Sequence, residues 1–483
     1  MPSNQSSADD FEPGIPPQEK VLLAAMSVLL IFMPWAIGTM PLWSQLTALG
    51  LAALCFVISV LPRPEDPVTP GAVKLIRFPV FHAGLLLMGY IAIQGFNPAW
   101  TYLELAGRWY MIPVQDHIDW LPTGTDTAFT VSNPFRYMVI LGIPFLACCA
   151  LWCGITRKSS VFFLFIMLVL NAVVLSILGF AQIFTGADKI FWVVEHHARH
   201  TVASFIYRNH AAAYFNLMVG LSGALALYYF HEGRLMLRRS DPSGIFLFFA
   251  VILLALVGLS LSRAGAVLGT ITLLSLFSVF LFNALVQRAT ASNRLIAVCI
   301  MALVVIFGGY LVSQIDYDRL VERFDQISEL DDRPWQVRWS AQKASADMFV
   351  NNWFYGTGAG SFRWLFPAYQ DWERDAATFG PDRLWQYAHN DVLQYPIELG
   401  VVGMAFVVFI IGYFGWQLVV WRTLQNPLAF FLVLVLGITV IHALIDFPFQ
   451  NPAILTAWCV LLTLVTILVR MENVAERRRR RRS

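Results

Sequence analysis

The stretch VFFLFIMLVLNAVVLSILGFAQIF, residues Val161–Phe184, decides the fold class of this chain. No residue in it carries a charge, and most of its side chains are aliphatic or aromatic. A helix needs about 20 mostly apolar residues to cross the hydrocarbon core of a bilayer. This stretch is therefore predicted to span a membrane as one helix.

The composition extends this prediction to the whole chain of 483 residues. Hydrophobic residues make up 58% of it and charged residues only 13%, and the mean hydropathy is +0.62. Soluble domains carry about 25% charged residues, so most of this chain is expected to face lipid. The formal net charge of +2 gives no case for a nucleic acid partner.

About twelve runs of comparable character follow one another along the chain. We therefore predict an all-α integral membrane protein with about twelve transmembrane helices. The expected spans are Val21–Gly38, Leu46–Leu61, Phe78–Gln94, Tyr137–Trp152, Val161–Phe184, Ala211–Phe230, Ile245–Ser260, Ala264–Val286, Leu295–Val312, Leu393–Trp421, Leu428–Ile445 and Ala453–Val469.

The distribution of Lys and Arg supports this count, because cytoplasmic loops of membrane proteins are enriched in both. If the N-terminus is cytoplasmic, the short outer loops carry almost no basic residue except Arg263. The inner segments carry Arg63, Lys74, Arg77, Arg157, Lys158, Arg234, Arg238, Arg239, Arg288, Arg294, Arg422 and the run Arg477–Arg482. Both termini are therefore expected in the cytoplasm.

The chain then divides into five parts. These are a polar N-terminus (1–20), nine spans (21–312), a large and mainly helical outer loop (313–392), three spans (393–470) and a basic tail (471–483). The N-terminus lacks a basic region and a small-residue cleavage site, so the first span is expected to be retained. The arginine tail is expected to anchor the last helix and to contact anionic membrane lipids.

No pattern establishes a metal or another cofactor. The six cysteines lie in apolar runs and show no metal-binding spacing. A DxD pair, Asp316 and Asp318, and the cluster His196, His197 and His200 lie in outer segments. Neither shows a further ligand, so we expect no metal site, and these two patterns stay open.

Charged residues at the outer ends of spans are candidates for function, because such groups are costly within a membrane. Arg263 lies between two spans with almost no loop, where it either snorkels to the interface or serves function. Arg338 lies in the large loop, where a solvated helix face paired with Asp331 or Asp332 is the plainer interpretation. Asp446, one turn after His442, either pairs structurally or takes part directly.

The stretch YAHNDVLQYPIELG, Tyr387–Gly400, joins the large loop to the tenth span. His389 is a natural general base near neutral pH, and it is equally interpretable as an interfacial residue. Asp391 is expected to be the N-cap of the following helix, because its side chain accepts hydrogen bonds from the first backbone amides. The glycine motif GTGAGSF (356–362) predicts a tight turn near the site, since its spacing does not fit a phosphate loop.

Four stretches in this order resemble the O-antigen ligase and polymerase superfamily. They are FIYRNHAAAY (205–214), LSLSRAG (259–265), Arg338 followed by GTGAGSF, and HNDVLQYPIELGVVG (389–403). The detailed resemblance covers roughly residues 200–450. The family often has proline before the glycine motif, where this chain has Trp353.

The resemblance implies a bacterial inner-membrane enzyme with a periplasmic active face and a periplasmic large loop. Such enzymes are metal-independent glycosyltransferases that move a glycan from undecaprenyl pyrophosphate to an acceptor hydroxyl. It implies His389 as the catalytic base and Arg263 and Arg338 as pyrophosphate-binding residues. Secondary roles fall to the side chains Arg208, Asp446, Glu398 and Asn390, of which Glu398 is expected to orient a neighbour.

The acceptor is left open by the sequence. A ligase uses lipid A core, a polymerase uses another lipid-linked repeat unit, and a protein-glycosylating relative uses Ser or Thr. The alternative from another class is a transporter, since about twelve helices fit many carriers. Carriers of that size usually consist of two related halves, and the sequence shows no such symmetry.

Overall fold

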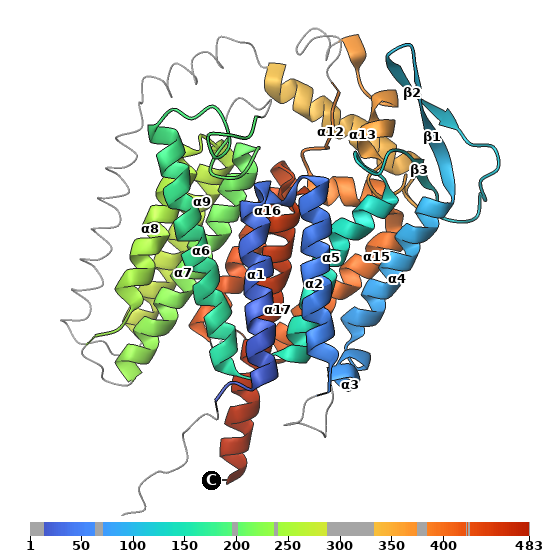
Figure 1. The fold of residues 1–483 in the computed structure, drawn as a ribbon. Coiled ribbons are helices and arrows are strands. Elements are labelled where there is room, and N and C mark those ends of the chain that lie inside the picture. Colours follow the sequence, from blue (N-terminus) through green and yellow to red (C-terminus); the bar gives the residue numbers. More distant parts are fainter. Residues whose placement is uncertain are drawn as a thin grey trace, which may run out of the picture.

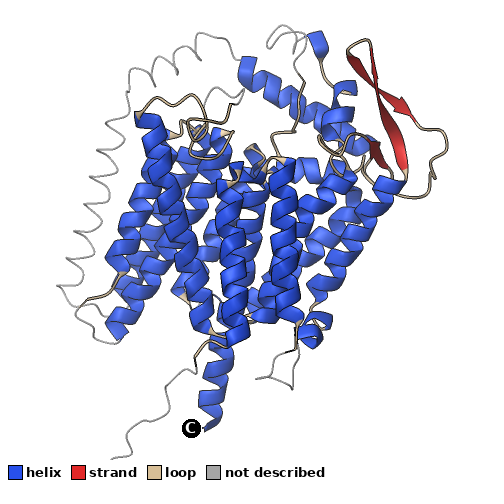
Figure 2. Cartoon of the chain, in the orientation of Figure 1, coloured by secondary structure: helices blue, strands red, loops and turns tan. Residues whose placement is uncertain are grey.

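The computed structural model describes residues 14–62, 71–195, 201–235, 240–286, 333–373, 384–421, 423 and 426–482 (Figure 1). Long helices form one bundle, and a small group of short helices and strands covers one end of it. We call that end, the upper end in Figure 1, the loop face. Apart from one small sheet, the regular structure is helical (Figure 2), so the chain is an all-α integral membrane protein, as predicted.

Among the described residues, ten helices are long and apolar enough to cross a membrane, and α8 is a further apolar helix of 17 residues. Each of these helices coincides with a predicted span, and the remaining predicted span (295–312) lies outside the described residues. The helices are α1 (Pro17–Trp35), α2 (Leu42–Val60), α4 (Pro79–Phe96), α5 (Pro134–Gly154), α6 (Lys158–Phe184), α7 (Arg208–Leu235), α8 (Ser243–Leu259), α9 (Arg263–Val286), α15 (Asp391–Val420), α16 (Pro427–Ile445) and α17 (Pro452–Arg482).

An asparagine followed by proline starts three of these helices. The side chains of Asn133 and Asn426 accept hydrogen bonds from the amides of Arg136 (2.8 Å) and Ala429 (3.0 Å), which caps α5 and α16. Asn451 accepts in the same way at the start of α17, from Ala453 (3.1 Å). Proline suits the first helical position, because its missing N–H would have no partner there. The sequence thus fixes where these helices begin.

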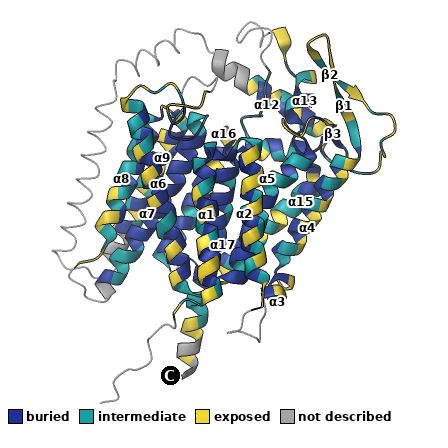
Figure 3. Cartoon of the chain, in the orientation of Figure 1, coloured by how far each residue is buried: buried dark blue, intermediate teal, exposed yellow. Residues whose placement is uncertain are grey.

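Burial is distributed as a membrane bundle requires. The central helices α7 and α17 are almost entirely buried, whereas α2, α4 and α15 turn large apolar side chains outward (Figure 3). Leu86, Phe409 and Trp416 are examples of these exposed side chains. An exposed apolar surface of this extent marks contact with lipid.

A three-stranded sheet follows α4 on the loop face. Strands β1 (Pro98–Leu105) and β2 (Arg108–Pro113) form an antiparallel hairpin, and the short β3 (Gly124–Asp126) pairs with β1 in parallel. The turn residues Ala106 and Gly107 both have positive φ, as a tight two-residue hairpin turn requires. The sequence pattern had predicted only a long outer segment here, without strands.

Short elements from the predicted large loop pack beside this sheet. They are α12 (Arg333–Asn351), α13 (Phe362–Leu365) and the 3₁₀ helix η2 (Phe366–Ala368), which agree with a partly helical loop. Met348, Phe362 and Phe366 form a small core with Ile397 from α15. The loop is therefore fastened to the bundle through the outer half of α15. Three further short helices are α3 (Gly71–Ile76), η1 (Ile37–Thr39) and η4 (Pro448–Gln450).

Candidate functional site

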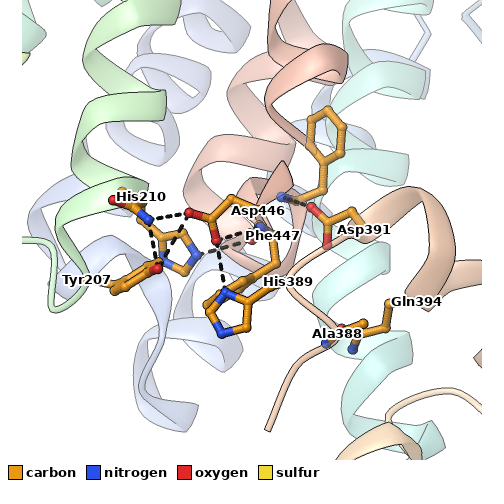
Figure 4. A network of polar contacts seen from close by, with 10 residues as sticks. Tyr207, His210, Ala388, His389, Asp391, Gln394, Asp446 and Phe447 are labelled. Atoms are coloured by element: carbon orange, nitrogen blue, oxygen red, sulfur yellow. Dashed lines mark hydrogen bonds and ion pairs between the residues drawn. The ribbon is translucent and has the colours of Figure 1, made fainter. Parts of the chain in front are cut away.

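Asp446, at the end of α16, is the centre of a polar cluster on the loop face (Figure 4). One oxygen of its carboxylate lies 3.5 Å from Nδ1 of His389 and also accepts the amide of Phe447 at 2.9 Å. The other oxygen accepts hydrogen bonds from the Asn209 amide and, at 3.5 Å, from the Tyr207 hydroxyl. Residues from α16, the segment before α15 and the start of α7 therefore meet at one carboxylate.

His389 lies just before α15 in a backbone conformation that favours glycine. Its φ is +50°, and a non-glycine residue in this region is uncommon and costs energy. The imidazole lies edge-on to Trp385 (centroid distance 5.3 Å) and to Phe447 (4.7 Å), and the side chain keeps 24% exposure. Two aromatic rings and Asp446 thus hold the imidazole at the surface of the cluster.

The Asp446 carboxyl is almost completely buried, and burial alone would raise its pKa. His389, His210 and His442 act in the opposite direction and bring the pKa below its ordinary value of 3.8. The carboxylate is therefore charged at neutral pH. A charged carboxylate at Nδ1 orients a histidine and leaves Nε2 to exchange a proton. In the described part of the chain, no hydrogen bond engages Nε2 of His389.

Phe447 organises the aromatic side chains around this cluster. Tyr207 and Tyr387 both stack on its ring, with centroid distances of 5.2 and 4.5 Å and interplanar angles of 12° and 13°. Its carbonyl oxygen lies 3.1 Å from Nε2 of His210. Tyr207, Asn209, Tyr387 and Phe447 were not among the predicted site residues. Only FIYRNH among the motifs pointed toward the first two.

The cap of α15 differs from the prediction. Asn390 is the N-cap, because its side chain accepts the Leu393 amide at 3.1 Å. Asp391 is instead the first residue of the helix, and its carboxylate accepts the Phe449 amide at 2.7 Å, which ties α15 to η4. The expectation that Asp391 caps the helix was wrong, because a distant amide offers this carboxylate a partner that local sequence does not reveal.

Glu398 is buried within α15 and holds the glycine motif. Its carboxylate accepts the amides of Gly360 (3.0 Å) and Phe362 (3.4 Å) and the side chain of Gln394 (3.1 Å). The main-chain amide of Gly358 donates a hydrogen bond of 2.9 Å to the main-chain carbonyl of Glu398. Because these amides bind protein groups, the motif is a structural turn and not a phosphate loop.

The same contacts interrupt α15 at Gly400, where φ is +62° and ψ is −177°. The amides of Val401 and Val402 bind the carbonyl groups of Trp353 and Phe354, at 2.8 and 3.2 Å. Tyr90 donates its hydroxyl to the carbonyl groups of Tyr355 (2.6 Å) and Leu399 (2.8 Å). A broken helix is tolerated at this depth because protein groups satisfy the freed backbone.

Two of the predicted arginines, Arg208 and Arg263, lie at helix starts on the loop face. Arg208 is the first residue of α7, next to Asn209, and Arg263 is the exposed first residue of α9. A hydrogen bond of 2.7 Å from Asn216 to the Gly265 carbonyl fastens these two helices together. Arg338 lies in α12, and its side chain is outside what the structure describes. The structure thus brings Arg208 beside the Asp446 cluster and leaves the Arg338 side chain unassigned.

A small pocket lies next to the cluster and contains two arginines that were not among the predicted site residues. Arg136, Arg363, Tyr387 and Glu398 are among its lining residues. Arg136 is used structurally, since it binds the Gln45 side chain (2.9 Å) and several carbonyl groups. Burial lowers the pKa of the Arg363 guanidinium below its ordinary value. The nearby Tyr387 opposes this shift.

Within the described residues, no three His, Cys, Asp or Glu side chains gather as a metal site. Asp316, Asp318, His196, His197 and His200 lie outside those residues. The two patterns that the sequence left open therefore remain open.

Comparison with known proteins gives one family match. The sequence profile of the O-antigen ligase family (Wzy_C) matches residues 248–408, a range from α8 into α15 that contains Arg263, Arg338, the glycine motif and His389. No curated protein matches the chain. The match supports a glycosyltransferase-like role in O-antigen processing for this membrane protein. Residues 248–408 thus match the O-antigen ligase family, the superfamily that the motifs predicted.

Proposed function

We propose that this protein transfers a glycan from an undecaprenyl-pyrophosphate carrier to an acceptor hydroxyl, without a metal ion. The reaction takes place on the loop face, which is periplasmic in this proposal, and the protein resides in the bacterial inner membrane with both termini in the cytoplasm. The acceptor is the lipid A core. A repeat-unit polymerase and a protein transferase share the same donor chemistry.

The observation that carries this proposal is the pairing of His389 with Asp446 beside the start of α7. A histidine oriented by a buried carboxylate is suited to general base catalysis, and Nδ1 of His389 lies 3.5 Å from the carboxylate. The start of α7 supplies Arg208, and α9, which packs on α7 and α16, supplies Arg263. Base and cations therefore lie on one face of the bundle.

The transfer reaction can be written with the acceptor hydroxyl, the lipid-linked donor and His389 alone. The acceptor oxygen forms a bond to the anomeric carbon while His389 takes the hydroxyl proton at Nε2. The bond from that carbon to the pyrophosphate breaks, and its electron pair leaves on the pyrophosphate. The proton on His389 is later returned to solvent.

Arginine suits the leaving group. Its planar guanidinium binds phosphate oxygens through two hydrogen bonds and stays protonated. Arg263, Arg338 and secondarily Arg208 are assigned to the pyrophosphate, where negative charge develops as the bond breaks. Asn390 and Glu398 keep indirect roles, as the cap of α15 and the holder of the glycine motif.

A transfer assay with purified protein and lipid-linked glycan tests this assignment. We expect Arg263→Ala and Arg338→Ala each to lower transfer by about 10²-fold or more, since each removes charge stabilisation of the leaving group. Arg77→Ala, an exposed arginine at the opposite end of the bundle, is the matched control. Undiminished transfer in both variants would contradict the proposed function.

Deletion in the source bacterium separates ligase from polymerase. Lipid A core without polymer indicates a ligase, whereas single repeat units on the core indicate a polymerase. An unchanged surface polysaccharide with altered protein glycosylation indicates a protein transferase.

A further inference from the structure

A wide groove with a volume of about 930 Å³ lies on the loop face between the β1–β2 hairpin and α13. Its lining is dominated by aromatic side chains. They are Trp100, Trp109, Tyr110, Trp364, Tyr369 and Trp372. Neither the family match nor the proposed chemistry assigns any role to this groove.

The aromatic surface is rigid at its base and open at its rim. Trp364 is buried, donates its ring N–H to the Ser132 carbonyl at 3.1 Å, and packs edge-on against Trp109 with a centroid distance of 5.6 Å. Trp100, Tyr110 and Trp372 are 37%, 47% and 43% exposed. Open aromatic faces on a fixed support are poorly explained by packing alone and point to a ligand.

The lining fits a sugar chain. A pyranose ring has apolar C–H faces that stack on aromatic rings, and its hydroxyl edges need hydrogen-bond partners. Asn352 and Arg108 provide such partners in the same groove. Among the described residues of the lining, none is acidic. Neutral and acidic sugars are therefore both admitted.

The groove adjoins the Asp446 cluster through α13. Trp364 of this short helix lines the groove, and its neighbour Arg363 lines the small pocket on the other side, together with Tyr387. Tyr387 stacks on Phe447, which contacts the imidazole of His389. The groove is therefore linked to His389 through packed side chains of α13 and of the Asp446 cluster.

The position of the groove relative to the arginines indicates which of the two substrates, donor or acceptor, binds in it. The starts of α7 and α9 meet α16 on one side of the cluster, and α13 and the sheet lie toward the other side, next to α15 and α4 (Figure 1). In a single displacement at an anomeric carbon, the attacking hydroxyl and the leaving group occupy opposite faces of the sugar. With the pyrophosphate at Arg263, and secondarily at Arg208, on the first side, the groove on the other side is left for the acceptor.

We propose that this groove binds the glycan of the acceptor substrate and so presents its hydroxyl to His389. This inference rests on the proposed function for the side of approach, and on the aromatic lining for the class of ligand. It favours a saccharide acceptor over a protein acceptor.

Binding to full-length purified protein in detergent tests the class of ligand. The probes are the core oligosaccharide and the single repeat unit, each released by mild acid from the source bacterium. We expect one of them to bind, and we expect Trp100→Ala combined with Trp372→Ala to weaken that binding about tenfold or more. Trp120→Ala is the matched control, because Trp120 is 72% exposed on the same outer segment and does not line the groove.

A transfer assay on the same proteins tests which substrate is bound. We expect the double variant to raise the KM for the acceptor about tenfold and the KM for the donor less than twofold. The opposite pattern would overturn the acceptor assignment, and so would groove-dependent binding of a Ser-containing pilin-type peptide in place of the saccharides. If the double variant keeps its Tm and binds the saccharide as tightly as the wild type, the groove is not the saccharide-binding site.

The two proposals fail separately. If the wild-type protein binds a saccharide through the groove but transfers no glycan, the proposed function fails and the groove remains a saccharide site. If the protein transfers glycan and binds neither saccharide, the groove inference is wrong and the proposed function stands.

Discussion

The main-chain amide of Asp391 donates a hydrogen bond of 3.3 Å to the main-chain carbonyl of Asp446. This bond joins the start of α15 to the end of α16. It fixes the register between the two elements that carry His389 and the Asp446 carboxylate. The distance between base and carboxylate is therefore set by the backbone as well as by the side chains, and the first predictions concern this pair.

Replacing His389 should abolish transfer while the protein stays folded. His389→Asn is the sharper variant, because asparagine tolerates the positive φ at this position and cannot act as a base. We expect a loss of about 10²–10⁴-fold, the usual contribution of a general base. Transfer assays and thermal melting in detergent are the measurements. His117→Ala, in the outer segment after β2, is the control. A stable and active His389→Asn variant would show that His389 has a structural role and is not the catalytic base.

Replacing the Asp446 carboxylate should also reduce transfer. Asp446→Asn keeps the shape but removes the charge that orients His389, and it places an amide among the donors of Asn209, Tyr207 and the Phe447 main chain. In a related arrangement such a change costs about 10⁴-fold in rate. Asp188→Asn, an exposed carboxylate on the same face, is the control. Full activity in Asp446→Asn would remove the carboxylate from the mechanism.

The contribution of Asp446 to stability should depend on pH in one direction. Its pKa in the folded protein lies below the ordinary value of 3.8, so the charged carboxylate stabilises the fold above that value, and the contribution is lost as pH falls through the lower folded pKa. We expect the Tm difference between wild type and Asp446→Asn to persist above about pH 5 and to shrink below about pH 4. A difference that shrinks already near pH 6 would show that the carboxylate is not held in its charged form.

The break in α15 should not tolerate a side chain. At Gly400, φ is +62°, and an added Cβ would lie 2.3 Å from the Phe354 carbonyl oxygen. We expect Gly400→Ala to destabilise the protein by about 3 kcal/mol or more, through backbone strain and the clash. Gly412→Ala in the same helix is the matched control, because nothing lies within 4 Å of its added Cβ. Equal Tm values for the two variants would show that the break is not constrained.

The bundle could be predicted because membrane helices need only local information, namely long apolar runs and the placement of Lys and Arg. The cluster was predicted in part. His389, Asp446 and Arg208 lie in motifs that mark helix starts and ends on one face. The cap was assigned to Asp391 instead of Asn390 because both residues suit a cap, and only the distant Phe449 amide separates them.

Other features depend on contacts between remote segments and leave no local signal. The stack of Tyr207 and Tyr387 on Phe447 joins three segments that are far apart in sequence. Gly400 stands at the start of a long apolar run with no turn residues beside it, so its role emerges only when the glycine motif packs against it. The hairpin β1–β2 also lacks a strict alternation of apolar and polar residues, because Trp109–Ile112 is a continuous apolar run.

The position of the break also defines how this protein can be divided. The short part of α15 before Gly400 is bonded to the outer elements as well as to the bundle, and its Ile397 packs with Phe362 and Met348 of the outer elements. A chimera that exchanges outer loops between related proteins must therefore cut at Gly400, inside a transmembrane helix, and not at the membrane surface. The exchanged module then carries His389 together with the groove beside it.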